Sequence, residues 1–485
     1  MAVDTEHATI AARRKDIARV RAALDGKVDD QIIQMPGHDE DDYAKFVERA
    51  YWLPATQRTH EAYVGMVMSP EPIVQGVPKG KEYLREDITS SGEPLERLAA
   101  TVVGEVLATG RCAVLVDYPE TNGEKVITRR VAEDMGLRPY ATYYSYDNII
   151  NWRTGTVGGR TVLTQIRLRE VFEVQDPADE FETDAMERIR VLDLIDGIYR
   201  VRIYERHVDN KGKNNWLQTG EMYPRKNGEY LTEIPCFVFG VSTLDINLAV
   251  QAEPPMLPLA KVNISHLNNS ASLEWALLWV GSPTMFIAGR VPTDDQGQPY
   301  PIRLGSSTAL VMEEGSKAEI LQASADSLGA LRQSMEDKRR DMVSIGSRVL
   351  QESGTGQIST ETDASQQAGE RSTLAQVAGT VSDGMTKVLQ LMLDWDGSEA
   401  PDASVALNRD YAPKDLTPQE LTAWTNAVQQ GTLPQSMFLA LLKKRGAAAQ
   451  EMTLEDFEEE IEEGSMGQDD TTDFDQPEPV DDDDE

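Results

Sequence analysis

EPPMLPLAKVNISHLNNSASLEWALLWV (253–280) begins the stretch that decides the fold; SLGALRQSMEDKRRDMVSIGSRVL (327–350) and STLAQVAGTVSDGMTKVLQLMLDW (372–395) complete it. Apolar residues recur in each segment at spacings of three, four and seven, which predicts three amphipathic helices. Such narrow stripes favour packing against other helices, either in the same chain or in identical copies around a ring. The apolar stripes are Leu257, Ala260, Ile264, Leu267, Ala271 and Leu278; Leu328, Leu331, Met335, Met342, Ile345 and Val349; and Leu374, Val377, Val381, Met385, Val388, Met392 and Trp395.

Two segments separate these helices. Residues 281–323 are rich in β-formers and turn residues, which predicts a small excursion of two to four strands. QESGTGQISTETD (351–363) has two glycines and no apolar period, so we expect a loop between the second and third helices.

The chain before residue 253 predicts helices followed by strands. Helices are expected at 8–25, within DEDDYAKFVERAYWLP (39–54), at 55–69 and in EPLERLAATVVGEVLATG (93–110), directly before the buried strand CAVLVDYP (112–119). From Arg138 to Gly240 the apolar period changes to two, which predicts an antiparallel, partly exposed sheet packed on the helices. The fold class is therefore α+β.

Composition limits the functional classes. The net charge is -35, and residues 455–485 alone hold 17 Asp or Glu and no Lys or Arg. We expect a short acidic helix in TLEDFEEEIEEG (453–464) and a disordered acidic C-terminus from Ser465 onward. A protein that grips nucleic acid by neutralising phosphates normally presents a basic face, which argues against tight DNA binding. No apolar run is long enough for a membrane span and no secretory signal is present, so no membrane partner is expected. Cys112 and Cys236 lie in apolar contexts, which favours buried free thiols.

No catalytic constellation emerges. The five histidines are scattered, and with two distant cysteines they offer no zinc spacing. GVPKGKEY (76–83) differs from a phosphate-binding loop in spacing and in lacking Ser or Thr after the lysine. We therefore expect no enzymatic activity, no metal and no cofactor.

Two charged features can be interpreted either as ordinary solvent-exposed surface or as functional sites. Lys338, Arg339 and Arg340 form the main basic cluster outside the N-terminus; the cluster is either a solvated face balanced by neighbouring acids or positive charge along a DNA path. The acidic segment is either a solubilising tail or an electrostatic hook for a basic partner.

Several stretches, in this order along the chain, resemble tailed-bacteriophage portal proteins, in a branch known mainly as an uncharacterised portal-like domain. The resemblance spans roughly residues 40 to 460, and its most specific part is RPYATYYSYDNIINWR together with LATGRCAVLVDYP. The matching stretches are YWLPATQRTHEAYVGMV, LAATVVGEVLATGRCAVLVDYP, RPYATYYSYDNIINWR, VLDLIDGIYRVRIY, EIPCFVFG, PLAKVNISHLNNSASLEWALLWVGSPTMFIAG and LNRDY.

The resemblance implies a portal-like division of the chain. The expected regions are a wing of helices and antiparallel sheet (1–252), a first stem helix (253–280), a β-rich clip (281–324), a second stem helix (325–350), a tunnel loop (351–362), a long wing helix with connector (363–414), a helical crown (415–464) and the acidic tail (465–485).

It also implies a function and partners. Portals are closed rings, typically of twelve copies, at one capsid vertex, and genomic DNA is packaged and ejected through the channel. The implied partners are other copies of the chain, weakly bound double-stranded DNA, terminase, a head-completion adaptor, and the major capsid and scaffolding proteins, with assembly in the host bacterial cytoplasm. The alternatives are another virion structural or scaffold-interaction protein and an acidic-site hydrolase.

Candidate site residues follow from this division. The DNA-facing candidates are Lys338, Arg339, Arg340, Gly354, Thr355, Gly356, Ser359 and Thr360. Partner-docking candidates in the clip are Asp294, Asp295, Arg303 and Lys317. Subunit-packing candidates are Leu328, Leu331, Met335, Met342 and Ile345.

Overall fold

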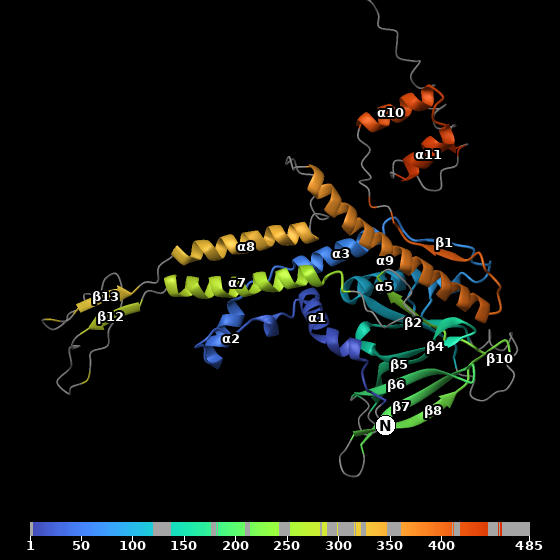
Figure 1. Cartoon of the computed structure of the whole chain (residues 1–485), viewed down its shortest axis with the longest axis horizontal. Coiled ribbons are helices and arrows are strands. Elements are labelled where there is room, and N and C mark those ends of the chain that lie inside the picture. The colour runs from blue at the N-terminus through green and yellow to red at the C-terminus, as the bar shows by residue number, and fades with distance from the viewer. Residues whose placement is uncertain are drawn as a thin grey trace, which may run out of the picture. The chain divides into compact units, whose positions relative to one another are not determined.

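A computed structural model of the chain (Figure 1) divides into two compact units, Met1–Arg409 and Asp410–Glu485. The structure describes residues 3–457 except 120–136, 176–180, 182, 209–213, 242–252, 282–283, 289–297, 299–314, 316, 322–325, 347–359, 410, 412–417, 445–453 and 455.

Four N-terminal helices form where their apolar periodicity and caps predict them, and a short fifth helix at 83–86 was not predicted. Gly26, with a φ of 70°, ends the first helix in the left-handed conformation, and the Asp39 side chain caps the second by accepting from the Asp42 N–H at 2.8 Å. These helices are α1 (Ala8–Asp25), α2 (Glu40–Arg49), α3 (Ala55–Val67), the short α4 (Tyr83–Glu86) and α5 (Leu95–Thr109).

The expected sheet is in fact two antiparallel sheets. The first has the order β11-β2-β3, with β2 (Arg111–Asp117) between β3 (Tyr140–Tyr144) and β11 (Cys236–Gly240). Every residue of β2 is buried, as its continuous apolar run predicts for a central strand. Gly110 separates α5 from β2 and adopts a positive φ of 81°.

The second sheet has five strands in sequence order. They are β4 (Ile149–Val157), β5 (Arg160–Gln175), β6 (Thr183–Ile195), β7 (Ile198–Val208) and β8 (Asn214–Met222). Because each strand pairs with the next by an antiparallel register, short turns suffice to connect them. A further ribbon joins β9 (Arg225–Lys226) to β10 (Glu229–Tyr230).

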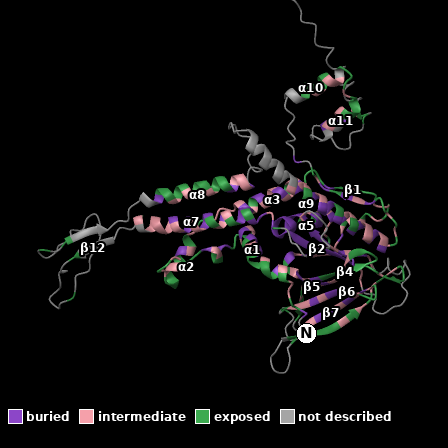
Figure 2. Cartoon of the chain, viewed as in Figure 1, coloured by how far each residue is buried: buried purple, intermediate pink, exposed green. Residues whose placement is uncertain are grey.

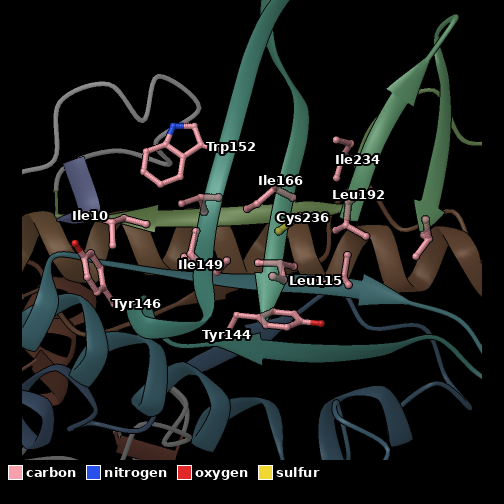
Figure 3. Packing of buried hydrophobic residues seen from close by; sticks show 14 of the residues in the cluster. Ile10, Leu115, Tyr144, Tyr146, Ile149, Trp152, Ile166, Leu192, Ile234 and Cys236 are labelled. Carbon is pink, nitrogen blue, oxygen red and sulfur yellow. The ribbon is translucent and has the colours of Figure 1, made fainter. Parts of the chain in front are cut away.

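The two sheets share one core (Figure 3). Leu115 and Tyr144 of the smaller sheet, and Ile166 and Leu192 of the larger one, belong to a single cluster of buried residues. Both cysteines are buried free thiols, as predicted. Burial raises the pKa of the Cys236 thiol to about 12, so it stays protonated at neutral pH.

A buried carboxylate ties α1, α5 and the 3₁₀ turn Tyr146–Asn148 together. Glu105 is only 7% exposed and accepts two hydrogen bonds from the Arg21 guanidinium, at 2.8 and 2.6 Å. It also accepts from the backbone N–H of Tyr146 at 2.9 Å. Bidentate pairing with an arginine offsets the desolvation of a buried carboxylate. The contact therefore fixes the positions of α1, α5 and the turn relative to one another.

The long helix α9 (Thr360–Trp395) confirms the third predicted stripe. Leu374, Val377, Val381, Met385, Val388, Met392 and Trp395 are all buried. The helix packs against α5, β2 and β11 of the same unit. Its stripe is therefore satisfied inside the chain, and purple marks this burial in Figure 2.

The connector expected after the long helix, within 363–414, contains a strand. β14 (Ser404–Ala406) pairs antiparallel with β1 (Ile73–Gln75), so segments far apart in sequence close on each other. A Cβ atom at Gly76 would lie 2.5 Å from the carbonyl oxygen of Asp402, so only glycine allows this approach. Each strand has only three residues, too few for a periodicity signal.

An element boundary corrects one other expectation. The second long helix, α8 (Asp326–Ile345), ends its described part at Ile345, whereas α9 begins at Thr360, so the last three residues of the expected loop 351–362 are helical. In the second unit, α10 (Pro418–Gln429) and α11 (Gln435–Lys444) lie within the span 415–464 that was expected to be helical.

Replacing Glu105 by Leu should destabilise the fold. The change leaves the Arg21 guanidinium and the Tyr146 N–H without their buried acceptor, at a cost of about 3 kcal/mol. Urea unfolding at constant protein concentration measures the loss. The control, Glu61→Leu, removes an exposed carboxylate that accepts a hydrogen bond from Gln57, and its free energy of unfolding should stay within about 0.5 kcal/mol of that of the original chain. Equal effects of the two changes would refute the structural role of Glu105.

Candidate functional site

The candidate site is a helical hairpin. Helix α7 (Leu257–Gly281) and helix α8 pack side by side, and a ribbon of β12 (Thr284–Ala288) and β13 (Lys317–Leu321) connects them (Figure 1). Asn269 Nδ2 donates to Ser334 Oγ at 2.9 Å, and Lys338 Nζ donates to the Ser265 carbonyl at 3.1 Å. The later α7 residue, Asn269, contacts the earlier α8 residue, Ser334, and the earlier one, Ser265, contacts the later one, Lys338. The two helices therefore run antiparallel.

Polar side chains of α7 attach the hairpin to the N-terminal helices. The Asn263 amide oxygen accepts from the Thr56 N–H at 3.1 Å and from its hydroxyl at 2.9 Å, while its nitrogen donates to the Leu53 carbonyl at 2.9 Å. Asn268 bonds to the backbone of Gln31 and Ile33. Ser270 Oγ accepts from the Tyr51 N–H at 2.9 Å.

Sequence reasoning missed this polar clamp. We define the clamp as Asn263, Asn268 and Ser270, all in the run NISHLNNS. Asparagine and serine inside an apolar-periodic helix are the signal that could have found it, because buried amides and hydroxyls need partners. The clamp satisfies backbone groups of residues 31–33 and 51–56, which are otherwise a loop and a helix start.

The apolar stripe of α8 is only partly covered within the described chain. Leu328 and Met342 are buried, whereas Leu331, Met335 and Ile345 keep intermediate exposure. Helix α8 packs chiefly against α7, and Figure 2 shows long exposed stretches along it. Of the five subunit-packing candidates, two are therefore buried within the chain, and the other three retain accessible apolar surface.

The basic cluster on α8 does not act as one group. Lys338 turns towards α7 and is half-buried, and this burial lowers the pKa of its ammonium group. Arg339 and Arg340 are exposed and lie 3.8 and 3.7 Å from Glu336 and Asp337, one turn earlier. Exposed pairs of this kind contribute little to stability, so both guanidinium groups remain available to solvent anions.

His266 is a buried residue of α7 that feels the positive charges of Lys338 and Arg339 on α8. It is 0% exposed, and neither ring nitrogen has a hydrogen-bond partner within the described residues. Burial, with the positive charges of Arg339 and Lys338, lowers the pKa of His266 to about 4. The ring is therefore neutral at neutral pH, and protonating it would place an unpaired cation inside the hairpin.

Several predicted site residues lie outside the described residues. They are Asp294, Asp295, Arg303, Gly354, Thr355, Gly356 and Ser359. Lys317 is exposed at the start of β13, where it pairs with Ala288. Thr360 is the first residue of α9 rather than a loop residue.

No group of acidic, histidine or cysteine side chains that could hold a metal occurs within the part of the chain that the structure describes. Among those same residues, no helix is long and apolar enough to cross a membrane.

One comparison with known protein families matches the stretch that contains the hairpin. A family model described as "Domain of unknown function (DUF4055)" matches residues 255–396, which are α7, the ribbon, α8 and α9. No curated protein matches.

Two solved structures match over most of their length. One is described as "Neck of empty GTA particle computed with C6 symmetry" and is 12% identical, covering 80% of this chain and 90% of its own, with a TM-score of 0.36. The other, "Virion of native gene transfer agent (GTA) particle", is 12% identical, covering 92% of this chain and 99% of its own, with a TM-score of 0.33. At TM-scores this low, neither match carries a functional argument.

His266 should make stability depend on pH. Its pKa is about 4 in the folded chain and 6.5 in an unperturbed histidine, so between these values only the unfolded state binds the proton. The free energy of unfolding should therefore fall as the pH drops through this window, by up to about 3 kcal/mol. Urea unfolding at a series of pH values measures the slope.

The matched variants separate His266 from other titrating groups. His266→Leu should flatten the slope between these pH values, whereas replacing the exposed His207 by Gln should leave it unchanged. A slope that survives His266→Leu would show that the ring does not titrate in this window.

Proposed function

We propose that this chain is a portal-type subunit: identical copies form a closed ring, and double-stranded DNA passes through its centre. The observation that carries the proposal is the incompletely covered α8. Leu331, Met335 and Ile345 form one stripe, and a second apolar surface is needed to remove it from water. A neighbouring copy supplies that surface if the hairpins stand side by side.

The clamp supports the same arrangement. Because Asn263, Asn268 and Ser270 fix α7 to the N-terminal helices, the hairpin has a set direction relative to that part of the chain. A contact between two different surfaces of neighbouring copies forms a ring when its rotation closes. The sequence resemblance to portal proteins adds independent support.

The charges of α8 fit a conduit for DNA with weak contacts. Arg339 and Arg340 are exposed on a chain whose net charge is -35. Two such groups per copy would touch phosphates briefly, whereas the acidic remainder would repel the duplex and prevent tight binding. In this proposal the chain is structural and not enzymatic, and terminase and a head-completion adaptor are its docking partners at the capsid vertex.

A second proposal is another structural protein of a phage-like virion. It explains the α8 stripe equally well, because any neighbouring virion protein could cover it. A ring of identical copies with a central channel, seen in negative-stain images of the purified chain, would decide between the two. Rings without a channel, or a stable monomer near the chain mass of 53.8 kDa, would reject the portal proposal.

Met335→Asp should abolish rings while leaving the chain folded. Met335 keeps intermediate exposure in one chain, so the new carboxylate stays hydrated in the monomer and is desolvated only between copies. Native mass spectrometry reports the rings, and circular dichroism reports the fold.

Two controls make this result specific. Met342→Asp should unfold the hairpin, because Met342 is buried within the chain, and Ile33→Asp should change neither property, because Ile33 is 75% exposed outside α8. Normal rings from Met335→Asp would place the α8 stripe away from the subunit interface.

Replacing Arg339 and Arg340 by Gln should lower the DNA packaged per particle and leave the rings intact. Both guanidinium groups are exposed, so their loss removes phosphate contacts without unpacking α7 from α8. Quantifying DNA in purified particles measures the effect. The comparison is Arg13 and Arg14 to Gln on α1, with the same change in charge; equal packaging by both double variants would remove the α8 arginines from the DNA path.

A further inference from the structure

One face of the five-stranded sheet gathers arginines in this acidic chain. Side chains alternate between the two faces of a strand, and the strand registers place several arginines on the face opposite the main core. We call this surface the arginine face. Its members are Arg153 of β4, Arg167 and Arg169 of β5, and Arg200, Arg202 and Arg206 of β7.

Part of this face is already occupied. Val3 sits in a small apolar cluster with Ile189, Val191 and Tyr204, and the Val3 carbonyl accepts from Arg167 at 3.4 Å. Asp193 pairs with both Arg200 and Arg202, and Glu187 lies 3.7 Å from Arg206. These contacts neutralise the β7 side of the face.

The β4–β5 side has an excess of positive charge. Among the described residues no carboxylate lies within ion-pair distance of Arg153, Arg167 or Arg169, and the Nε atom of Arg169 has no hydrogen-bond partner there. Burial and the positive charges of Arg153 and Arg202 lower the pKa of Arg167. Because these guanidinium groups repel one another, binding of an anion between them would relieve the repulsion.

The chemistry of the face favours carboxylates over nucleic acid. Tyr204 is 3% exposed and its hydroxyl bonds to Gln218 and Arg202, so its ring cannot stack on a base. The partly buried ring of Trp216 lies under the Arg206 guanidinium, 5.8 Å from its centroid. The other accessible groups are mainly planar guanidinium forks, which pair bidentately with carboxylates as they do with phosphates. Residues 465–485 of this chain hold ten Asp or Glu and no cation.

We propose that the arginine face docks the acidic C-terminal segment, residues 465–485, of a neighbouring copy. The arginine face is complementary to the acidic segment, and neither surface is complementary to itself. Each copy offers one arginine face and one acidic segment, so these contacts continue from copy to copy until a ring closes. They also offset the repulsion between chains that are each strongly acidic. The inference rests on the proposed ring, which brings copies together.

The test uses two full-length variants that are mixed and then treated with a bis-maleimide. One carries Val171→Cys, because Val171 is 62% exposed and pairs with Glu187 on the arginine face. The other carries Asp483→Cys in the acidic segment. The native cysteines are buried and should not react. We expect a two-chain product, whereas Ile33→Cys, which is exposed elsewhere, should give little.

Charge variants identify the interaction. Changing Arg153, Arg167 and Arg169 to Gln in the Val171→Cys chain should reduce the product at least about fivefold, as should high salt. The same charge change at Arg14, Lys15 and Arg19 of α1 should not reduce it. Changing Asp481, Asp482, Asp484 and Glu485 to Asn or Gln removes the partner's charge without touching the sheet, and should also reduce the product.

Each other outcome overturns a defined part. If rings form without the cross-linked product, the docking is rejected and the proposed function stands. If the product forms without rings, the docking stands and the proposed ring is rejected. If neither forms, both proposals are rejected. A cross-link that forms only when both cysteines are in one chain rejects the neighbouring copy as the source. Unchanged product in the charge variants, with loss of duplex-DNA retardation, would assign the face to phosphate.

Discussion

The hydrogen bonds of Asn263 are the constraint on which the hairpin depends. One amide satisfies the Thr56 N–H and hydroxyl and the Leu53 carbonyl, all at the start of α3. An unpartnered buried amide costs more than a typical hydrogen bond contributes, so this geometry admits little sliding of α7 along its axis. The register of α7 then sets that of α8, through Asn269 and Ser265. The partial exposure of the α8 stripe follows from that register.

Local signals were sufficient for elements with strong periodicity and a clear end. The helix α5, the glycine at 110 and the strand β2 could be predicted because an apolar period of 3.6 stops at a residue that tolerates positive φ and a continuous apolar run follows. The α9 stripe is another such case. In contrast, alternation alone does not identify β4, because one extra residue, Ile150, lies between the paired residues Ile149 and Asn151 and breaks the period of two. The split into two sheets depends on strand pairing that no local pattern records.

The sequence was sufficient to predict which helix carries the candidate site residues, but not which of them face another helix and which face solvent. Spacing placed Lys338, Arg339 and Arg340 together, but successive residues on a helix point about 100° apart, so one faces α7 and two face solvent. In the same way, Met335 and Met342 share a stripe but differ in burial, because the partner helix covers only part of it. The buried His266 could not be distinguished from a surface histidine without knowing where α8 lies.

The β12–β13 ribbon has a consequence for folding. Its five residue pairs, from Thr284 with Leu321 to Ala288 with Lys317, close the chain before residues 289–316 begin. The entropy of closing a loop grows only slowly with its length, so insertions or exchanges beyond the ribbon add little cost to folding. That segment can therefore change in length or sequence while α7, α8 and the clamp stay unchanged. The ribbon separates the folding of the hairpin from whatever chain is inserted beyond it.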